Sequence, residues 1–192
     1  MQQVNDCDVF ETIDVADLWC VDKLILAKRL GYYCGPAGVA PKPGTYIVRP
    51  VMNLRMMGLG ASIEYLNSDS IPLGYFWCEV FSGRHLSFDY HYGSQTLAVE
   101  GFRSSSRLDR FSYWTRISEQ FVLPPVLEEV ASRYPHFNVE VIGDRVIEVH
   151  FRYNDDFENH NADTIVPVWK ENFYASACGD RLGFILVESK EC

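Results

Sequence analysis

The stretch NVEVIGDRVIEVHFRYN, Asn138–Asn154, predicts a β-hairpin around which the rest of the chain can be organised. Asn138–Ile142 alternates apolar and polar residues in the way that a half-buried strand does. Gly143-Asp144 is suited to a tight turn, and Arg145–Phe151 then follows as the second strand. Successive side chains of a strand point to opposite faces, so one face of the hairpin is expected to enter the core. That face carries Val139, Val141, Ile147, Val149 and Phe151, whereas Val146 departs from the alternation.

The opposite face of the hairpin collects charged and polar side chains: Glu140, Glu148, His150 and Arg152. Like charges that face one another across a sheet destabilise it. A divalent metal ion would remove this cost, which makes Glu140, Glu148 and His150 candidate metal ligands. The alternative is a solvated face in which Glu140 pairs with Arg145 or Arg152, because antiparallel sheets commonly leave one face exposed to water.

Length and composition fit one domain, or two small lobes that share a cleft. The 192 residues are 47% hydrophobic and 14% aromatic, which is enough apolar material for a real core. The net charge of −9 argues against broad binding to a nucleic-acid backbone. A local basic patch is still allowed by the sequence, formed by Arg103, Arg107, Arg110 and Arg116.

The sequence shows no targeting signal and no cysteine motif. No apolar run reaches membrane-spanning length, and MQQVNDCDVF at the N-terminus lacks the basic start and apolar stretch of a signal peptide. The six cysteines show neither C-x-x-C pairs nor the spacing of a zinc site. We therefore expect reduced thiols, a cytoplasmic location and no membrane partner.

Ahead of the hairpin, the sequence predicts one helix and several strands. Asp14–Leu30 has mainly helical apolar spacing, with Asp14 or Asp17 as its N-cap and Gly31 after its end. The following segment, Tyr32–Gly44, is rich in proline and glycine and predicts an ordered loop. Strands are predicted at Thr45–Val51, Gly74–Phe81, His85–Tyr92 and Thr96–Phe102. The polar face of the third of these strands is expected to be solvated.

The remaining elements complete an α+β protein with a mainly antiparallel sheet and few helices. Pro124–Tyr134 predicts a helix with proline in its first turn. Short strands are predicted at Ile165–Trp169 and Leu182–Val187, and no element is assigned to Arg103–Gln120.

The strand Thr45–Val51 and the loop after it carry two candidate anion-binding arginines. Arg49 is a charge inside an otherwise apolar strand, where it would be expensive unless it is paired or its end reaches water. Met52–Ala61, MNLRMMGLGA, contains Arg55 and two glycines, and glycine lets backbone N–H groups approach a phosphate. The loop matches neither common phosphate-binding pattern, so a flexible surface loop is the alternative.

The order of these motifs, from about residue 22 to residue 152, resembles the nucleotide-binding region of the ATP-grasp superfamily of carboxylate–amine ligases. Asp22-Lys23-Leu24, followed by Gly31, resembles the segment that opens this region. Tyr46–Pro50, YIVRP, resembles the strand whose lysine holds ATP phosphate, with Arg49 at the place of the lysine. Met52–Ala61 corresponds to the glycine-rich loop that folds over the phosphates.

The later motifs continue this resemblance. Cys78–Phe81, CEVF, resembles the hinge that binds adenine through the backbone and ribose through an acid. Gly83–Tyr90, GRHLSFDY, is similar to the turn and return strand after the hinge. Ile147–Arg152, IEVHFR, resembles the signature Glu-x-Asn-x-Arg, with His150 at the place of the asparagine. Glu140 lies on the preceding strand, where the family has its other metal-binding acid.

The resemblance implies an ATP-grasp-like fold of reduced size, with two small lobes around a nucleotide cleft. A single domain would span residues 1–192, with approximate lobes 14–92 and 93–192. The implied cofactors are ATP and Mg²⁺. The implied metal ligands are Glu140, Glu148 and His150, and the implied catalytic residues are Arg152 and Arg49. The implied nucleotide-binding residues are Arg49, Arg55, Glu79, Val80, Phe81 and His85.

The activity that the resemblance implies is ATP-dependent ligation, in which a carboxylate is phosphorylated and an amine or thiol then attacks the acylphosphate. The partners would be a nucleotide and a small-molecule or peptide substrate that carries the carboxylate or the amine, without nucleic acid or membrane. Two alternatives remain open. One is a non-catalytic nucleotide-binding protein that retains the fold, and the other is a structural or interaction module without a nucleotide.

Overall fold

Two antiparallel sheets form the framework of this computed structural model, which describes residues 9–52, 60–103, 108, 110–154, 156–157, 161–169 and 181–187. The smaller sheet has the order β1-β4-β2-β3 and contains β1 (Cys34–Pro36), β2 (Gly44–Pro50), β3 (Ser62–Leu66) and β4 (Tyr75–Glu79). The larger sheet has the order β11-β10-β7-β6-β5-β8-β9. Its strands are β5 (His85–His91), β6 (Ser94–Phe102), β7 (Tyr113–Arg116), β8 (Phe137–Ile142), β9 (Arg145–His150), β10 (Thr164–Trp169) and β11 (Arg181–Val187).

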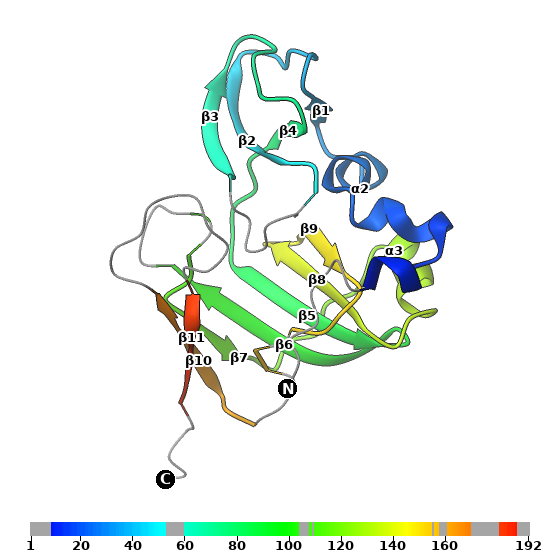
Figure 1. The fold of residues 1–192 in the computed structure, drawn as a ribbon, viewed down its shortest axis with the longest axis vertical. Coiled ribbons are helices and arrows are strands. Elements are labelled where there is room, and N and C mark those ends of the chain that lie inside the picture. The colour runs from blue at the N-terminus through cyan, green and yellow to red at the C-terminus, as the bar shows by residue number, and fades with distance from the viewer. Residues whose placement is uncertain are drawn as a thin grey trace.

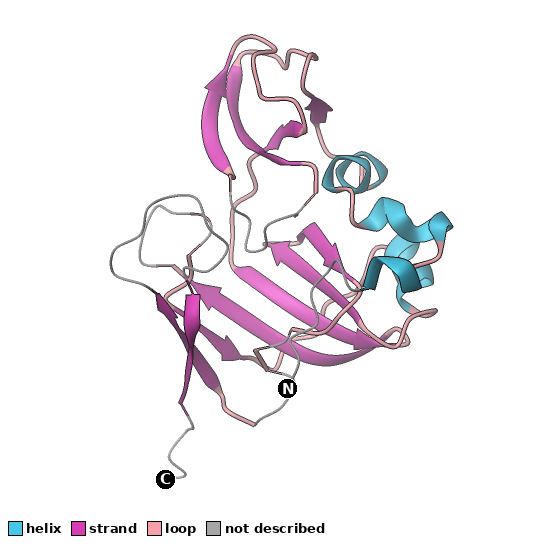
Figure 2. Ribbon diagram, in the orientation of Figure 1, coloured by secondary structure: helices cyan, strands magenta, loops and turns pink. Residues whose placement is uncertain are grey.

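The two sheets lie at opposite ends of the molecule (Figure 1). The helices are gathered along one side of it (Figure 2). The α+β fold class, with mainly antiparallel strands and few helices, is thereby confirmed. The chain passes from the smaller to the larger sheet between Glu79 and His85. The sequence-based division into lobes at residues 92 and 93, which falls after β5, stays a prediction.

The predicted helix Asp14–Leu30 is wrong as a single element. It is divided into the 3₁₀-helix η2 (Val15–Cys20) and the α-helix α2 (Lys23–Arg29) because each part has its own aspartate cap. The Asp14 carboxylate accepts from Ala16 N (2.8 Å), and the Asp22 carboxylate accepts from Ile25 N (2.8 Å). The other described helices are η1 (Phe10–Thr12) and α3 (Pro125–Ala131). None of these is both long and apolar enough to span a membrane.

The main core lies on the apolar face of β5, β8 and β9, which the helices cover. Its buried members from the sheet include Leu86, Phe88, Phe137, Val139, Val141 and Val149, and those from the helices include Trp19, Leu26, Leu127 and Val130. Burial of each such side chain contributes roughly 1.5–3 kcal/mol, so this contact fixes which face of the sheet turns inward. The polar residues of the same strands are therefore all presented on the opposite face.

A β-bulge in β9 changes which residues of the hairpin face the core, so the structure differs from the prediction there. Glu140 pairs with Glu148 and Val141 pairs with Val146, so Ile147 is the extra residue of the bulge. Val146 is 1% exposed and joins the main core cluster, whereas Ile147 lies outside that cluster. The prediction that Ile147 takes this core position was wrong, because the bulge reverses the alternation on its far side.

The connection between the two sheets approaches the β8–β9 turn at two glycines. Gly83 has φ 131° and Gly143 has φ 63°, and a Cβ added to Gly83 would lie 2.7 Å from Gly143 Cα. Gly143 N also donates to the carbonyl oxygen of Arg84 (2.9 Å). These contacts fix the start of β5, and therefore the position of His85, beside the hairpin.

We expect Gly83→Ala to lower the free energy of unfolding by about 1–3 kcal/mol, because it adds backbone strain and a clash with backbone atoms. Gly38→Ala is the matched control. Gly38 also has a positive φ (83°), but nothing lies within 4 Å of an added Cβ. Urea unfolding of both variants measures the difference. Equal losses in the two variants would show that the approach to Gly143 contributes nothing.

Candidate functional site

The polar face of β5, β8 and β9 is buried in the described structure. His85, Ser87, Asp89, Asn138, Glu148 and His150 are each no more than 7% exposed. The expectation of a solvated face on β5 was therefore wrong for these side chains, because alternation reports only that a face is polar and not what covers it. The side chain of Glu140 is 28% exposed, so this acid is the most accessible of the two carboxylates and two histidines gathered there.

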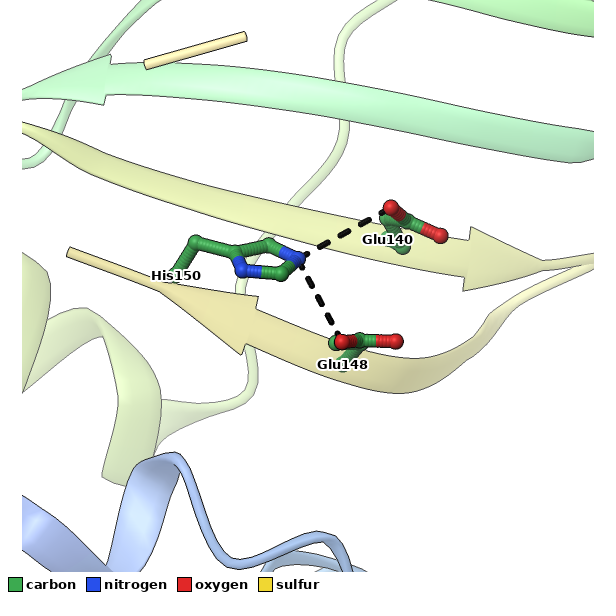
Figure 3. Close-up of side chains that lie close together, drawn as sticks. All are labelled: Glu140, Glu148 and His150. Carbon is green, nitrogen blue, oxygen red and sulfur yellow. Dashed lines mark ion pairs between the residues drawn. The ribbon is translucent and has the colours of Figure 1, made fainter. Parts of the chain in front are cut away.

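Glu140, Glu148 and His150 come together on adjacent strands (Figure 3). The two glutamates are direct cross-strand neighbours on β8 and β9. His150 Nε2 lies 3.8 Å from Glu140 Oε1 and 3.6 Å from Glu148 Oε1, so the imidazole faces both carboxylates. One ligand atom from each of the three residues lies within 4.8 Å of the others. The predicted ligand set is thus assembled in space, and its binding of a metal stays a prediction.

His85 is held between this cluster and an arginine. Its Nε2 lies 2.9 Å from Glu140 Oε2, and its Nδ1 lies 3.1 Å from Arg103 Nη2. Arginine can only donate, so His85 Nδ1 accepts from Arg103 and the proton of the neutral ring is on Nε2. His85 therefore donates to Glu140 and holds that carboxylate in place. The sequence associated His85 with the nucleotide, and no signal in it predicts this contact.

Aromatic rings pack beside His85 and Arg103. The imidazole of His85 meets Phe111 and Trp114 edge to face, with ring centroids 4.9 and 5.6 Å apart. Arg103 stacks on Phe111 at 3.9 Å. Arg116, in contrast, donates to the carbonyl oxygens of Ala162 and Phe157. Arg103 and Arg116 therefore make contacts within the fold, which does not support the basic patch that the sequence allowed. Arg107 lies outside the described residues.

Lys23, at the start of α2, is the main site residue that the sequence did not identify. Its Nζ lies 3.2 Å from Glu148 Oε1, and the two side chains are 4% and 9% exposed. A buried lysine is almost always paired, and Glu148 supplies its partner here. The sequence placed Lys23 only in a segment that resembles the opening of a nucleotide-binding region, because no local pattern reveals that this lysine is buried.

Arg49, on β2, connects the smaller sheet to the hairpin. Its Nη2 donates to the carbonyl oxygen of Ile147 (2.7 Å), the residue that the bulge leaves outside the regular pairing. The guanidinium lies 5.3 Å from the ring centre of Phe76. Its Nε is buried and has no hydrogen-bond partner in the part of the chain that the structure describes. An unsatisfied buried donor costs roughly 1–3 kcal/mol, so Arg49 has capacity for a further acceptor.

The electrostatics of the cluster are set by burial and by these pairings. Burial raises the pKa of Glu140, but the polar contacts with His150 and His85 more than offset it, leaving that pKa well below its ordinary value. Burial lowers the pKa of Lys23, an effect that Glu148 opposes and Arg49 reinforces. Burial likewise lowers the pKa of Arg49, and Glu148 again opposes the shift. The cationic and anionic side chains of this poorly hydrated site therefore stabilise one another in their charged forms.

The remaining predicted nucleotide-binding residues lie at the end of β4. The Glu79 carboxylate accepts from Tyr33 N (2.8 Å), Val80 is 42% exposed, and Phe81 packs edge to face on Tyr32 at 4.8 Å. Their roles with a nucleotide stay predictions. Arg55 and most of the loop Met52–Ala61 lie outside the described residues.

Arg152, the other residue predicted to be catalytic, follows β9. Its Nη1 donates to the carbonyl oxygen of Tyr153 (3.0 Å). Its catalytic role stays a prediction.

Comparisons with known proteins bear on the fold. No protein-family model matches the sequence, and no curated protein sequence matches it. Among solved structures, a protein from Archaeoglobus fulgidus described as a member of the ATP-grasp superfamily matches with a TM-score of 0.54 and 18% sequence identity. This match covers 89% of the present chain and 65% of that protein.

Two ligase structures also match. A D-alanine–D-alanine ligase from Bacillus anthracis gives a TM-score of 0.42 at 15% identity, over 69% of this chain and 57% of the ligase. An L-amino acid ligase from Bacillus licheniformis gives a TM-score of 0.45 at 13% identity, over 69% of this chain and 40% of the ligase. The chain therefore spans less than two thirds of the length of each of these three proteins. The match to the Archaeoglobus fulgidus protein and the two antiparallel sheets together show that this chain has an ATP-grasp-like fold.

Proposed function

We propose that the chain binds ATP together with a divalent metal ion and uses it to activate a carboxylate as an acylphosphate, which an amine or thiol then attacks. One observation carries this proposal. Two carboxylates of the larger sheet, the cross-strand neighbours Glu140 and Glu148, lie near cations that come from other elements. Lys23 of α2 pairs with Glu148, and Arg49 of β2 donates to the carbonyl oxygen of Ile147, the residue before Glu148. A site for a metal-bound polyphosphate needs carboxylates that hold the metal ion and, close to them, cations that bind the phosphate groups.

Phosphoryl transfer places few covalent demands on the protein. The negative charge of the transferred group must be neutralised, and the reacting oxygens must be held in line. The carboxylates alone would repel a polyphosphate, and a divalent metal ion held by Glu140 and Glu148 would convert this repulsion into attraction. The donor set fits this need, because two carboxylate oxygens with near neighbours that fix their direction are ligands for a hard divalent cation.

The other residues would position the nucleotide around that centre. Arg49 has a buried Nε without a partner among the described residues, and a phosphate oxygen would supply the missing acceptor. Lys23 would contribute a second positive charge at the same end of the site. The segment Glu79–Phe81, at the end of β4, is the place we assign to adenine and ribose, which follows the resemblance of CEVF to an adenine-binding hinge.

A thermal-shift screen of ATP, ADP and adenosine, each with and without a divalent metal salt, tests binding. A ligand at about 100 times its Kd stabilises the folded state by roughly 2.7 kcal/mol and raises the melting temperature. We expect the largest shift with ATP and metal together. No shift with any of these nucleotides would overturn the proposal and favour a structural or interaction module.

Phosphate release tests the reaction. We expect release only when ATP, metal and a carboxylate donor are all present, with product formed when an amine or thiol is added. The donor pool would contain amino acids and short peptides, because the proposed substrate is a small molecule or peptide with a free carboxylate. A nucleotide-dependent thermal shift without phosphate release from any pool would instead support a non-catalytic nucleotide-binding protein.

A further inference from the structure

We infer that the metal centre of Glu140, Glu148 and His150 takes a divalent transition-metal ion, such as Mn²⁺ or Zn²⁺, in preference to Mg²⁺. This assignment rests on the proposed function and names the class of metal for the same site. It departs from the Mg²⁺ that the resemblance implies. The reason is the chemistry of the three donors, one of which is an imidazole nitrogen rather than an oxygen.

His150 is placed so that its imidazole Nε2 would lie beside a metal ion held by the two glutamates. The residue is 6% exposed and belongs to the last position of β9, where it is the cross-strand partner of Asn138. Figure 3 shows Nε2 of its ring directed towards both carboxylates, and the distances from Nε2 to them differ by only 0.2 Å (3.8 and 3.6 Å). An ion that contacts both glutamates would therefore lie next to this nitrogen.

His85, the other histidine of the cluster, has a different role. His85 Nδ1 accepts from Arg103, so its Nε2 carries the proton that is donated to Glu140. A protonated nitrogen cannot bind a metal, and His85 therefore acts as a positioning residue for the Glu140 carboxylate. Partners of this kind fix the direction of a ligand and commonly contribute to metal affinity. The site thus offers two oxygen ligands and one nitrogen ligand.

This donor set discriminates between the candidate ions. Mg²⁺ prefers an all-oxygen, octahedral set and gives up its water reluctantly. Imidazole suits Zn²⁺, Cu²⁺, Fe²⁺ and Ni²⁺, and the affinity of a mixed nitrogen and oxygen site rises from Mn²⁺ to Cu²⁺ and is lower again for Zn²⁺. A Glu₂His set is therefore a better match for a transition ion, and the histidine is the residue that shifts the preference.

Mn²⁺ bound to the full 192-residue chain provides a direct probe, because pulsed electron paramagnetic resonance detects nitrogen nuclei coordinated to the ion. We expect nitrogen modulation from one imidazole in the wild type, and its loss in His150→Asn. His91→Asn is the matched control. His91 also lies on the sheet, but it is exposed and its Nδ1 contacts Pro135 O (2.8 Å) and the Tyr153 hydroxyl (2.9 Å) instead.

Calorimetric titration with Mn²⁺ and Mg²⁺ gives the second readout. The ratio of Mn²⁺ to Mg²⁺ affinity should fall by roughly tenfold or more in His150→Asn, because even an outer partner of a metal ligand is typically worth about 10–100-fold in affinity. His91→Asn should leave the ratio unchanged. The wild-type spectrum needs no variant, so the test stands even where His150→Asn fails to fold.

These measurements need no nucleotide, so they separate this inference from the proposed function. Bound Mn²⁺ without nitrogen modulation would overturn the assignment of the metal class, whether or not ATP binds. Nitrogen modulation together with the change in affinity ratio would support it. An ATP-dependent thermal shift that is equal with Mg²⁺ and Mn²⁺, and equal again in His150→Asn, would likewise count against a role for the imidazole.

A second inference comes from a different place in the fold: we propose that Cys34 and Cys78 form a reversible disulfide across the smaller sheet. They are register partners on β1 and β4. The hydrogen bonds on either side run from Glu79 N to Tyr33 O (2.9 Å) and from Ala37 N to Tyr75 O (3.2 Å). The cysteines therefore occupy a non-hydrogen-bonded position, where Cα atoms are about 4.5 Å apart and side chains approach most closely.

This spacing lies within the range of about 4.4–6.8 Å that disulfides span between Cα atoms. Cys34 is half-buried, and Cys78 is buried directly before Glu79–Phe81, the segment we assign to adenine and ribose. Cys34 is the more accessible of the two thiols, and the contact with Cys78 also lowers its pKa, so we assign it as the attacking thiol. Its thiolate would attack a small-molecule disulfide such as oxidised glutathione and release one thiol. Cys78 would then displace the second thiol, so two protein thiols are oxidised and the small disulfide is reduced.

Incubation of the full chain in a glutathione redox buffer, followed by alkylation and peptide mapping, tests this pairing. We expect a linked peptide containing Cys34 and Cys78 that dithiothreitol separates, and we expect Cys34→Ser to abolish it. Cys20→Ser is the control, since Cys20 is a buried free thiol in the main core cluster. Recovery of Cys34 and Cys78 as separately alkylated thiols in the most oxidising buffer would overturn the proposal.

Discussion

Glu148→Gln is expected to lower the free energy of unfolding by about 3–5 kcal/mol, the usual loss when one partner of a buried ion pair is removed. The reason lies in Lys23, whose Nζ is 3.2 Å from Glu148 Oε1 and whose side chain is 4% exposed. The neutral amide of glutamine cannot compensate that charge. Burial already lowers the pKa of Lys23 against the opposing effect of Glu148, so the variant removes the principal interaction that keeps the lysine charged.

Urea unfolding of Glu148→Gln, Lys23→Met and the double variant measures this coupling. We expect the double variant to lose less stability than the sum of the single variants, because it leaves no unpaired buried charge. Glu119→Gln is a control for the loss of a surface ion pair. Glu119 pairs with Arg84, the two side chains are 42% and 47% exposed, and such pairs are worth about 0–1 kcal/mol. Additive losses from Lys23→Met and Glu148→Gln would contradict a direct interaction.

The same variant should remove the metal-dependent part of nucleotide binding. Glu148 supplies one of the two carboxylates that we assign to the ion, and a glutamine oxygen carries no charge to replace it. The thermal shift with ATP and metal should therefore fall to that measured with ATP alone. Calorimetric titration with ATP and metal, at a temperature well below the unfolding transition, separates this loss of binding from the loss of stability. An unchanged, metal-dependent shift would show that the hairpin is not the metal site.

The hairpin could be predicted because its signals, alternation within each strand and a two-residue turn, are local. The direct pairing of Glu140 with Glu148 depends on the bulge as well, because a two-residue turn alone would pair Glu140 with Ile147. The bulge at Ile147 could not be predicted, since nothing in the alternation reveals which residue a strand leaves unpaired. Its consequence is functional, because the carbonyl oxygen of Ile147 is the one that accepts from Arg49.

The neighbours of the acidic face could not be predicted, because they arrive from elements that are distant in the sequence. Lys23 comes from α2 and Arg103 from the end of β6, and each reaches the cluster only when its element packs in place. A polar face such as that of His85 reads in the sequence as a solvated surface. Only the packing around it shows that His85 is buried and serves Glu140.

Arg49→Met is expected to weaken ATP binding by roughly 10–100-fold, which corresponds to the loss of a charge-assisted hydrogen bond of about 1.5–3 kcal/mol. Adenosine binding should change much less, because adenosine carries no phosphate. The guanidinium uses Nη2 to hold Ile147 O, and its buried Nε has no partner among the described residues. A phosphate oxygen would complete its hydrogen bonding. Titration calorimetry with both ligands measures the two affinities.

Two further variants separate the phosphate contact from support of the fold. Arg49→Lys keeps the positive charge but loses the planar fork, so we expect an ATP affinity between those of the wild type and Arg49→Met. Arg29→Met is the matched control, because Arg29 also lies over an aromatic ring, that of Trp19 at 4.1 Å, on the exposed end of α2. It should leave both affinities unchanged. Equal losses for ATP and adenosine in Arg49→Met would mean that this arginine only ties β2 to the bulge of β9.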